Sequence, residues 1–236
     1  MISVIIPARN EENVIGNCLK SLRSQDFKGA YEIIVIDGHS KDRTVAVASR
    51  YTHKVYKMHP RGPGAARNDG ARVASYPILA FIDADCIAPK HWLGQIEKDF
   101  EENEIIGLGG VLRPLHGRLI DRVMFRINSN WWLRLSAKLG LYQLTGNNCM
   151  YKKREFLRIG GFNIHVSFFE DTELSMRMIK EGKLMVDGEL WVRTSTRRFR
   201  QMGYVKLFKI NMTAFISALL RKPITTEYFE SRKKKK

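Results

Sequence analysis

The chain has 236 residues with an apolar fraction of 44%, which suits one large α/β domain or two small ones around a buried core. Its 40 Lys and Arg residues outnumber 24 Asp and Glu residues, giving a formal net charge of +16. This excess indicates an anionic partner, which could be nucleic acid, anionic lipid or a phosphorylated ligand. The apolar content indicates a folded globular protein.

The cysteines and the hydropathy of the chain indicate the cellular compartment in which the protein works. Cys18, Cys86 and Cys149 are scattered among apolar neighbours, which predicts reduced thiols in or near the core and disfavours a metal site made of them. Residues 1–7 lack the basic and long apolar regions of a signal peptide. No stretch reaches the roughly 20 apolar residues that span a bilayer. We therefore expect the catalytic part to be cytoplasmic.

The first part of the chain alternates between apolar strands and short helices. Strands are predicted at 3–7, 32–37 and 53–58, with helices at about 14–22 and 44–50 between them. This alternation is typical of a parallel, doubly wound sheet. Because right-handed crossovers gather the ends of such strands at one edge, Pro7, Asp37 and Asp83 are expected on the same rim.

A further buried strand at 78–82 ends on Asp83-Ala84-Asp85. Two carboxylates so close repel each other unless a positive group lies between them. A divalent cation bound to phosphate oxygens is one explanation. A strand-end turn followed by an acidic helix cap is the other, and the spacing alone does not separate them.

Glycines mark two places where another group could approach the backbone. A Gly- and Pro-containing loop at 61–64 opens a helix that extends to about residue 74, and its N-terminus could hold phosphate with help from Arg67. The predicted strand at 104–112 contains Gly107, Gly109 and Gly110, so the acceptor or the sugar is expected near it.

Two stretches have amphipathic helical patterns. In 118–138 the arginines share one stripe and apolar residues share another: Arg118, Arg122 and Arg126, against Leu119, Val123, Ile127 and Trp131. A solvated surface helix and a basic face near a membrane or an anionic acceptor both fit this pattern. The second stretch, about 204–221, fits either packing on the domain or an anionic membrane surface. We therefore divide the chain into a domain at 1–201 and a basic C-terminal segment at 202–236.

Charged residues in the second half of the chain add candidate chemistry. Glu170, Asp171 and Glu173 open a predicted helix, where acids often act as caps or dipole partners. The aromatic pair at 168–169 favours a shielded site in which a carboxylate could act as a base. Arg197 and Arg198 suit pyrophosphate or metal-bound phosphate, and equally a basic surface loop.

Five of these stretches, in this order, resemble the inverting family 2 glycosyltransferases of the GT-A fold. They are residues 3–12, 34–44, 64–68, 83–85 and 170–171, and the resemblance runs from Ser3 to about Arg198. It implies an α/β fold with a doubly wound, mostly parallel sheet flanked by helices, followed by a C-terminal amphipathic helix. It also implies transfer of a sugar from a UDP- or GDP-sugar to an acceptor hydroxyl or phosphate.

The resemblance implies a role for each matching residue. The residues implied to bind the nucleotide sugar are Pro7, Ala8, Arg9, Glu11, Asp37, Arg67, Asp83, Ala84, Asp85, Arg197 and Arg198. Among them, Asp83 would face the ribose or a nearby phosphate, and Asp85 would hold Mg²⁺ or Mn²⁺ between the two phosphates. Asp171 would deprotonate the acceptor hydroxyl, which attacks the anomeric carbon in one inverting displacement.

Two departures from the family pattern stand out. Gly38 occupies a place where many relatives carry a second acid, so the resemblance says less about which nucleotide base is bound. Arg193 matches a place where many relatives have a histidine near the metal, which puts a third protein ligand in doubt.

Two other classes of protein fit the sequence less well than this family. A sugar-phosphate nucleotidyltransferase would need a long Gly-rich N-terminal loop with basic residues, which 9–12 does not provide. A non-enzymatic nucleic-acid binder would need an aromatic and basic strand motif that is missing here. We therefore expect no nucleic-acid partner. The basic C-terminus favours a lipid-linked or polysaccharide acceptor and peripheral contact with the cytoplasmic membrane face.

Overall fold

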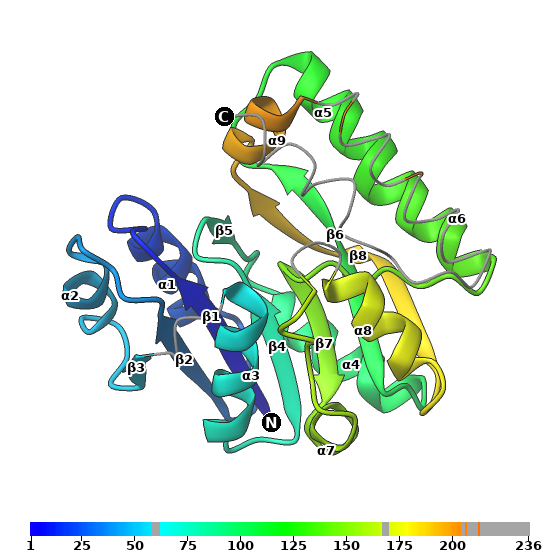
Figure 1. The fold of residues 1–236 in the computed structure, drawn as a ribbon, viewed down its shortest axis with the longest axis horizontal. Coiled ribbons are helices and arrows are strands. Elements are labelled where there is room, and N and C mark those ends of the chain that lie inside the picture. The colour runs from blue at the N-terminus through cyan, green and yellow to red at the C-terminus, as the bar shows by residue number, and fades with distance from the viewer. Residues whose placement is uncertain (58–61, 167–169, 204–205, 207–211, 213–236) are drawn as a thin grey trace.

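The computed structural model describes residues 1–57, 62–166, 170–203, 206 and 212. Within them an eight-stranded sheet has the strand order β3-β2-β1-β4-β7-β6-β8-β5, with helices packed on both faces (Figure 1). The strands are β1 (Ile2–Ala8), β2 (Tyr31–Asp37), β3 (Val55–Lys57), β4 (Ile78–Ile82), β5 (Cys86–Ile87), β6 (Gly107–Pro114), β7 (Asn148–Lys152) and β8 (Leu184–Thr194).

The helices flank the sheet and continue beyond one end of it (Figure 1). Those beside the sheet are α1 (Ile15–Arg23), α2 (Thr44–Ala48), α3 (Pro63–Val73), α4 (Trp92–Glu102), α7 (Lys153–Arg158) and α8 (Glu170–Met178). Three more, α5 (Leu119–Phe125), the π-helical turn η1 (Arg126–Trp131) and α6 (Trp132–Lys138), follow one another without a break. We call this unit the α5–α6 rod. A short helix, α9 (Arg197–Met202), follows β8.

The sheet combines a parallel half with a mixed half. Strands β3, β2, β1 and β4 are parallel to one another, and β6 is parallel to β8. Strand β7 runs antiparallel to β4 and β6, and β5 runs antiparallel to β8. The predicted α/β class is confirmed. The predicted amphipathic helix at about 204–221 and most of the C-terminal segment at 202–236 lie outside the described residues.

The glycines of β6 lie where other parts of the protein approach the strand. A side chain at Gly109 would collide with Leu144, and one at Gly110 would collide with Asn148 and the Leu190 carbonyl. The groups that approach these two glycines are therefore parts of the protein itself, and the expected place of the acceptor or sugar near β6 stays a prediction. Close packing of β6 against β7 and β8 explains them.

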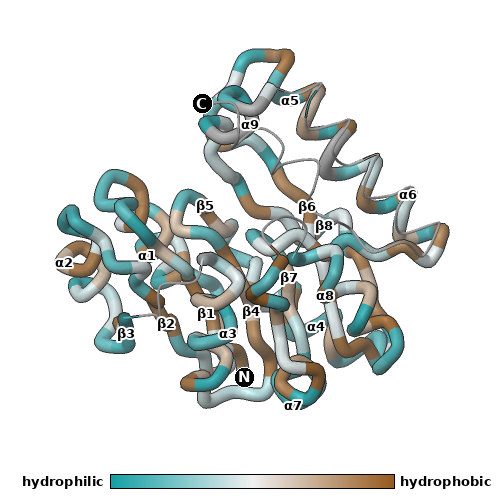
Figure 2. The backbone as a smooth tube through the Cα atoms, in the orientation of Figure 1, coloured by the Kyte–Doolittle hydropathy of each residue, from teal (hydrophilic) through white to brown (hydrophobic). Residues whose placement is uncertain are grey.

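Apolar side chains fill both faces of the sheet, and Figure 2 shows the hydrophobic residues concentrated along the strands. One core lies between the sheet and α1 and α4, and the other lies beneath α3, α7 and α8. Cys18, Cys86 and Cys149 are buried free thiols, as predicted. Burial raises the pKa of each thiol, which keeps these groups protonated and unreactive.

Helix α3 packs so closely on β1 that only glycine fits at position 70. A methyl group there would overlap Ile5 Cγ2 and lie 3.3 Å from Ile36 Cγ1, both in the buried core. Gly70→Ala is therefore expected to lower the free energy of unfolding by about 1–3 kcal/mol, because overpacking outweighs the better helix propensity of alanine. Urea denaturation monitored by circular dichroism measures this change.

Gly94→Ala is the matched control, because Gly94 also lies inside a helix but has no atom within 4 Å of its added methyl group. There the unfolding free energy is expected to rise by about 0.5–1 kcal/mol. Equal effects at both positions would contradict the close packing of α3 on β1.

Candidate functional site

The carboxyl ends of β1 and β4 open onto a cleft of about 440 Å³. The lining residues are Pro7, Ala8, Arg9, Glu11, Gly38, His39, Gly62, Pro63, Ala66, Arg67, Asp83, Ala84, Asp85 and Glu170. Pro7 and Asp83 thus meet at one edge of the sheet, as the parallel topology predicts.

Hydrogen bonds from the turn after β2 hold the loop after β1 in place. The backbone N–H of Asn10 donates to Ser40 Oγ at 2.9 Å, and that of Glu11 donates to Thr44 Oγ1 at 2.8 Å. In return, the Lys41 N–H donates to Asn10 Oδ1 at 2.8 Å. Two separate segments therefore form one wall of the cleft with a fixed shape.

Asp37 lies at the end of β2 beside Ala8, but it is buried and borders a separate hollow of about 290 Å³. Its carboxylate accepts hydrogen bonds of 3.3 and 3.2 Å from the Ser40 N–H. The residues that reach the cleft from this strand end are Gly38 and His39. His39 has a positive φ of 58°, so its backbone is in the left-handed conformation within this turn.

Arg67 forms the floor of the cleft. Its guanidinium is buried and donates to Asp83 Oδ1 at 2.8 Å, with Glu170 Oε1 at 3.5 Å. Burial opposes the charge, yet Asp83 and then other nearby anionic groups raise the Arg67 pKa. The sequence predicted that Arg67 helps to bind a phosphate. In the structure its positive charge is already paired with two carboxylates of the protein, Asp83 and Glu170.

Gly146 leaves the space that this guanidinium occupies. An added Cβ at Gly146 would lie 3.0 Å from Arg67 Cζ and 3.0 Å from its Nη2. The Gly146 N–H also donates to Asp171 Oδ2 at 3.1 Å. One glycine thus connects the arginine at the cleft floor with the carboxylate predicted to act as base.

Asp171 lies next to Glu170 in the first turn of α8. Its second oxygen accepts a hydrogen bond of 2.8 Å from the Thr172 N–H. Burial raises the pKa of Asp171, against the lowering effect of the Gly146 and Thr172 N–H groups. Burial, together with Asp171, also raises the pKa of Glu170. Two neighbouring carboxyl groups with raised pKa values suit proton transfer near this edge of the cleft.

Asp85 offers oxygen ligands to a cation. It is half-buried, and together with Asp83 it supplies carboxylates of the kind that Mg²⁺ and Mn²⁺ bind. Among the described residues, no group of three His, Cys, Asp or Glu side chains forms a metal site. A cation held by one or two carboxylates completes its coordination with water and substrate phosphates, as Mg²⁺ commonly does. The residues present fit such an ion.

A second cavity of about 510 Å³ adjoins the cleft at Asp85 and extends to His116, Thr196 and Arg197. Arg197 contacts the wall of the cleft through Glu11, with Nη2 3.3 Å from Oε1. Arg198 belongs to α9, and its side chain lies outside the described part of the structure.

Arg193 does not belong to the lining of the cleft. It is exposed on β8, opposite Ile87, and its guanidinium lies 5.5 Å from the centre of the Trp191 ring. The equivalence of Arg193 with a histidine near the metal stays a prediction.

Six lining residues lie outside the set assigned to the nucleotide sugar: Gly38, His39, Gly62, Pro63, Ala66 and Glu170. Of these, Gly62 and Pro63 belong to the loop expected to hold phosphate, and Glu170 was one of the candidate acids. Gly38 and His39 follow directly on Asp37, so the rule that ligands gather after parallel strands could have included them. Gly62 has a φ of 92°, which only glycine adopts readily, and Pro63 opens α3.

Comparison with known proteins identifies the family. The model of the family described as glycosyl transferase family 2 matches residues 3–157, well over half of the chain. The poly(ribitol-phosphate) beta-glucosyltransferase of Bacillus spizizenii is 32% identical over 133 residues, covering 53% of this chain and 21% of that protein. Glycosyltransferase AglE of Haloferax volcanii is 37% identical over 99 residues, covering 39% and 33%. The chain thus spans a third or less of these two relatives.

Solved structures share the fold. The mannosyltransferase PcManGT from Pyrobaculum calidifontis superposes with a TM-score of 0.75 at 19% identity, covering 97% of this chain and 66% of that one. S. aureus TarS 1–349 superposes with a TM-score of 0.68 at 21% identity, covering 96% and 67%. The family match sets aside the sugar-phosphate nucleotidyltransferase. The chain belongs to glycosyl transferase family 2 and has the mixed α/β architecture of the GT-A fold.

Proposed function

We propose that this protein transfers a sugar from a UDP- or GDP-sugar to an acceptor hydroxyl or phosphate, with inversion and with a divalent metal. The observation that carries the proposal is the cleft, which brings Asp83 and Asp85 together with the loop after β1 and with Glu170. Two solved relatives support the nucleotide sugar: TarS 1–349 in complex with UDP-GlcNAc, and PcManGT in complex with GDP-Man and Mn²⁺.

The proposed donor site follows the walls of the cleft. Pro7, Ala8, Arg9 and Glu11 bind the nucleotide, and Asp37 supports the turn that carries Gly38 and His39. Arg67 orients Asp83 toward the ribose side through their 2.8 Å ion pair. Ala84 leaves room between the two acids for the donor.

Asp85 is the proposed ligand of Mg²⁺ or Mn²⁺, and such an ion neutralises the charge on the departing nucleoside diphosphate. Arg197 and Arg198 add positive charge on the neighbouring side. Asp171 accepts the proton of the acceptor hydroxyl, whose oxygen forms a bond to the anomeric carbon as the bond to the diphosphate breaks. Since one displacement occurs, the configuration inverts and the enzyme supplies no nucleophile.

The proposed acceptor is lipid-linked or a polysaccharide. The names of two relatives support this class. One is a poly(ribitol-phosphate) beta-glucosyltransferase. The other, from Methanococcus voltae, is a dolichyl N-acetyl-alpha-D-glucosaminyl phosphate 3-beta-D-2,3-diacetamido-2,3-dideoxy-beta-D-glucuronosyltransferase. The latter is 27% identical over 84% of this chain. We also propose a catalytic domain at 1–201, a basic segment at 202–236, and a cytoplasmic enzyme that contacts the membrane surface peripherally.

Nucleotide release from a panel of UDP- and GDP-sugars with Mn²⁺, with acceptors of both classes, tests the proposal. The enzyme is expected to release nucleotide from the UDP-sugars or from the GDP-sugars. The nucleotide that it releases, UDP or GDP, is also expected to raise the thermal unfolding midpoint of the protein. If UDP and GDP both leave the midpoint unchanged in the presence of Mn²⁺, the proposed donor site is refuted.

A further inference from the structure

The α5–α6 rod presents an apolar row that the proposed reaction does not use. Exposed apolar side chains recur at every fourth position: Leu119, Val123, Ile127, Trp131, Leu135 and Leu139. Leu119 is 76% exposed and Trp131 is 75% exposed. Exposed apolar side chains that recur along one helical unit commonly mark an interaction site.

A different face of the rod holds it on the domain. Phe125, Leu133 and Ser136 are buried, and the rod contacts β6 and β8. Asp121, also buried, forms an ion pair with Arg200 of α9. The rod therefore has one apolar face that packs on the domain and a second that faces solvent.

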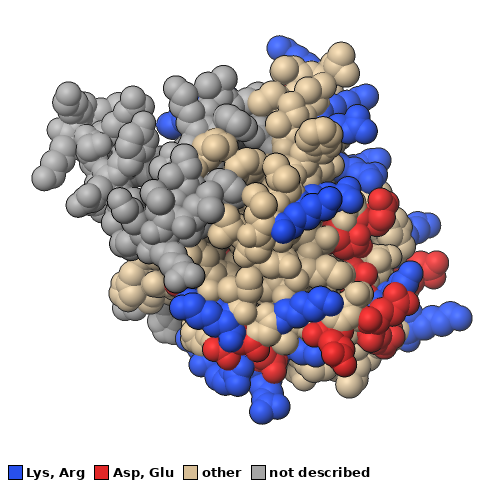
Figure 3. Space-filling model, turned by 90° about the vertical axis from the view of Figure 1, so that its right-hand side faces the viewer, with Lys and Arg blue, Asp and Glu red and all other residues tan. Residues whose placement is uncertain are grey.

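Positive charge borders the exposed row. The exposed basic residues of the rod and its N-cap are Arg118, Arg122, Arg126, Arg134 and Lys138. The single acid in the sequence 118–139 is Asp121, which is buried. In Figure 3, which views the side of the molecule formed by the rod, acidic side chains lie from about mid-height downward, and the described surface above them is basic or uncharged.

This combination favours an anionic lipid surface over a second copy of the chain. Two rods packed face to face would bring arginines against arginines, because the sequence offers them no exposed acid. A bilayer surface instead accepts apolar side chains among its headgroups and attracts Lys and Arg to its phosphates. Tryptophan is enriched at that depth, which fits the exposure of Trp131.

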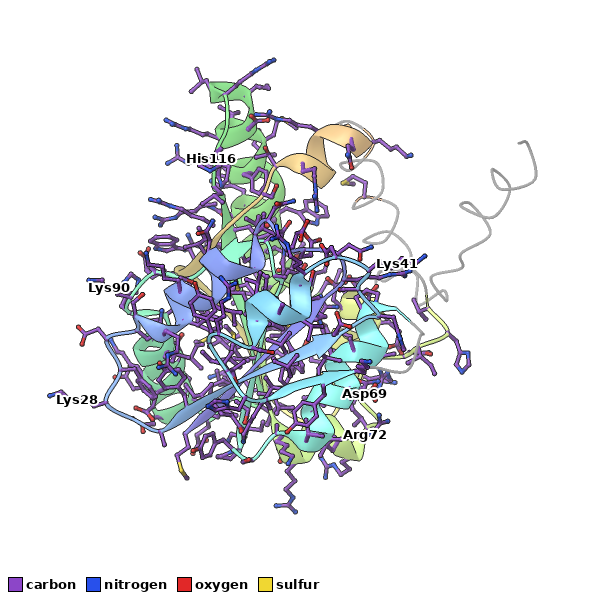
Figure 4. The ribbon with its side chains drawn as sticks, turned by 90° about the vertical axis from the view of Figure 1, so that its left-hand side faces the viewer. Lys28, Lys41, Asp69, Arg72, Lys90 and His116 are labelled. Carbon is purple, nitrogen blue, oxygen red and sulfur yellow. The ribbon has the colours of Figure 1, made fainter. Side chains whose placement is uncertain are left out.

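The rod also begins close to the proposed site. His116 lies just before its N-cap and beside the rod in Figure 4. With Asp85 and Arg197, His116 lines the cavity that adjoins the donor cleft. A surface in contact with the N-terminal part of the rod is therefore continuous with the proposed site through this cavity.

We propose that the exposed face of the α5–α6 rod docks the protein on an anionic bilayer. The apolar row lies among the headgroups, and the arginines contact lipid phosphates. No described helix is long and apolar enough to cross a membrane, so this contact is to the surface. The inference rests on the proposed function where it offers a route for a lipid-borne acceptor to the cleft.

Co-sedimentation of the full chain with vesicles tests the docking. Binding is expected to vesicles of phosphatidylcholine mixed with phosphatidylglycerol, weakly or not at all to phosphatidylcholine alone, and to weaken with salt. Trp131→Glu is expected to weaken binding about tenfold or more, because a carboxylate replaces an interfacial aromatic side chain. Arg122→Gln combined with Arg126→Gln is expected to weaken it about 25-fold, about fivefold for each charge.

Helix α7 provides the matched control. It carries an exposed apolar residue, Leu157, and an exposed basic residue, Arg154, and Figure 1 places it at the end of the molecule away from α5. Leu157→Glu combined with Arg154→Gln is expected to bind vesicles like the wild type. Circular dichroism and the thermal midpoint check that every variant is folded.

Three outcomes would overturn the docking surface. The first is equal binding to both kinds of vesicle, and the second is wild-type binding by Trp131→Glu. The third is loss of binding in a full-length variant with Lys233, Lys234, Lys235 and Lys236 changed to Gln, while both rod variants still bind. Stabilisation by UDP or GDP is measured without vesicles, so a failure of docking remains distinct from a failure of the proposed function.

Discussion

Replacing Asp171 by Asn is expected to lower kcat by about 10²–10⁴-fold, the range that a positioned general base contributes. The amide oxygen of Asn can accept one of the two hydrogen bonds that the Gly146 and Thr172 N–H groups donate to this carboxylate, while its NH₂ group faces the other donor. The variant is therefore expected to lose about 1–3 kcal/mol of stability, to keep its affinity for the nucleotide, and to lose proton acceptance. Turnover at saturating nucleotide sugar measures the loss of proton acceptance, and calorimetry measures the affinity for the nucleotide separately.

Glu173→Gln is the control on the same helix. Glu173 pairs with Arg177, with Oε1 2.6 Å from Nε, and no proposed role falls on it. Its replacement is expected to leave kcat close to that of the wild type. If Glu170→Gln lost activity and Asp171→Asn kept it, the base would be Glu170 instead.

The pH dependence offers a further check on Asp171. A base acts only when it is deprotonated, and burial raises the pKa of this carboxyl. The acidic limb of kcat/KM is therefore expected above the ordinary aspartate value of about 3.9. Asp171→Asn is expected to remove this limb from the residual activity.

Replacing Asp85 by Asn is expected to lower metal-dependent turnover by about 10²–10⁴-fold. A metal that neutralises a departing diphosphate contributes several kcal/mol, and each 1.36 kcal/mol corresponds to about tenfold in rate. The amide keeps the shape of the side chain but loses the charge that attracts the cation. Titration of activity with Mn²⁺ is expected to show a higher half-saturating concentration in this variant.

Asp69→Asn provides the comparison for this change. Asp69 is an acid on α3, 2.8 Å from Arg72, and Figure 4 shows both residues on the outer part of that helix. Its replacement is expected to leave the Mn²⁺ titration unchanged. A wild-type titration for Asp85→Asn would refute the metal ligand.

The local features of the site could be predicted from sequence because they depend on the ends of strands. Asp83 and Asp85 follow directly on an apolar strand, and parallel topology brings that end beside Pro7. The partners of Arg67 could not be predicted in this way. Glu170 is 103 residues away in the chain, and its distance from Arg67 depends on how α8 packs against α3.

The choice of which face of the rod is buried could not be predicted from sequence either. Periodicity predicts a two-faced helix at 118–138, and the structure has helical turns there. Which face is buried depends on contacts with β6 and β8, which are distant in sequence. The pattern of the sequence therefore predicted the stripes but left open which of them faces solvent.

The π-helical turn η1 reduces the rotation of the exposed row around the rod. In an unbroken α-helix, each step of four residues rotates by about 40° beyond a full turn, or about 200° from Leu119 to Leu139. A π turn holds more than four residues, so it rotates the row back. One extra residue corresponds to about 100° of rotation, so the drift along the row falls to roughly 100°. Both ends of the row, Leu119 and Leu139, are exposed. The extra residue in η1 therefore keeps the row within about a third of the circumference of the rod, where an unbroken α-helix would spread it over more than half.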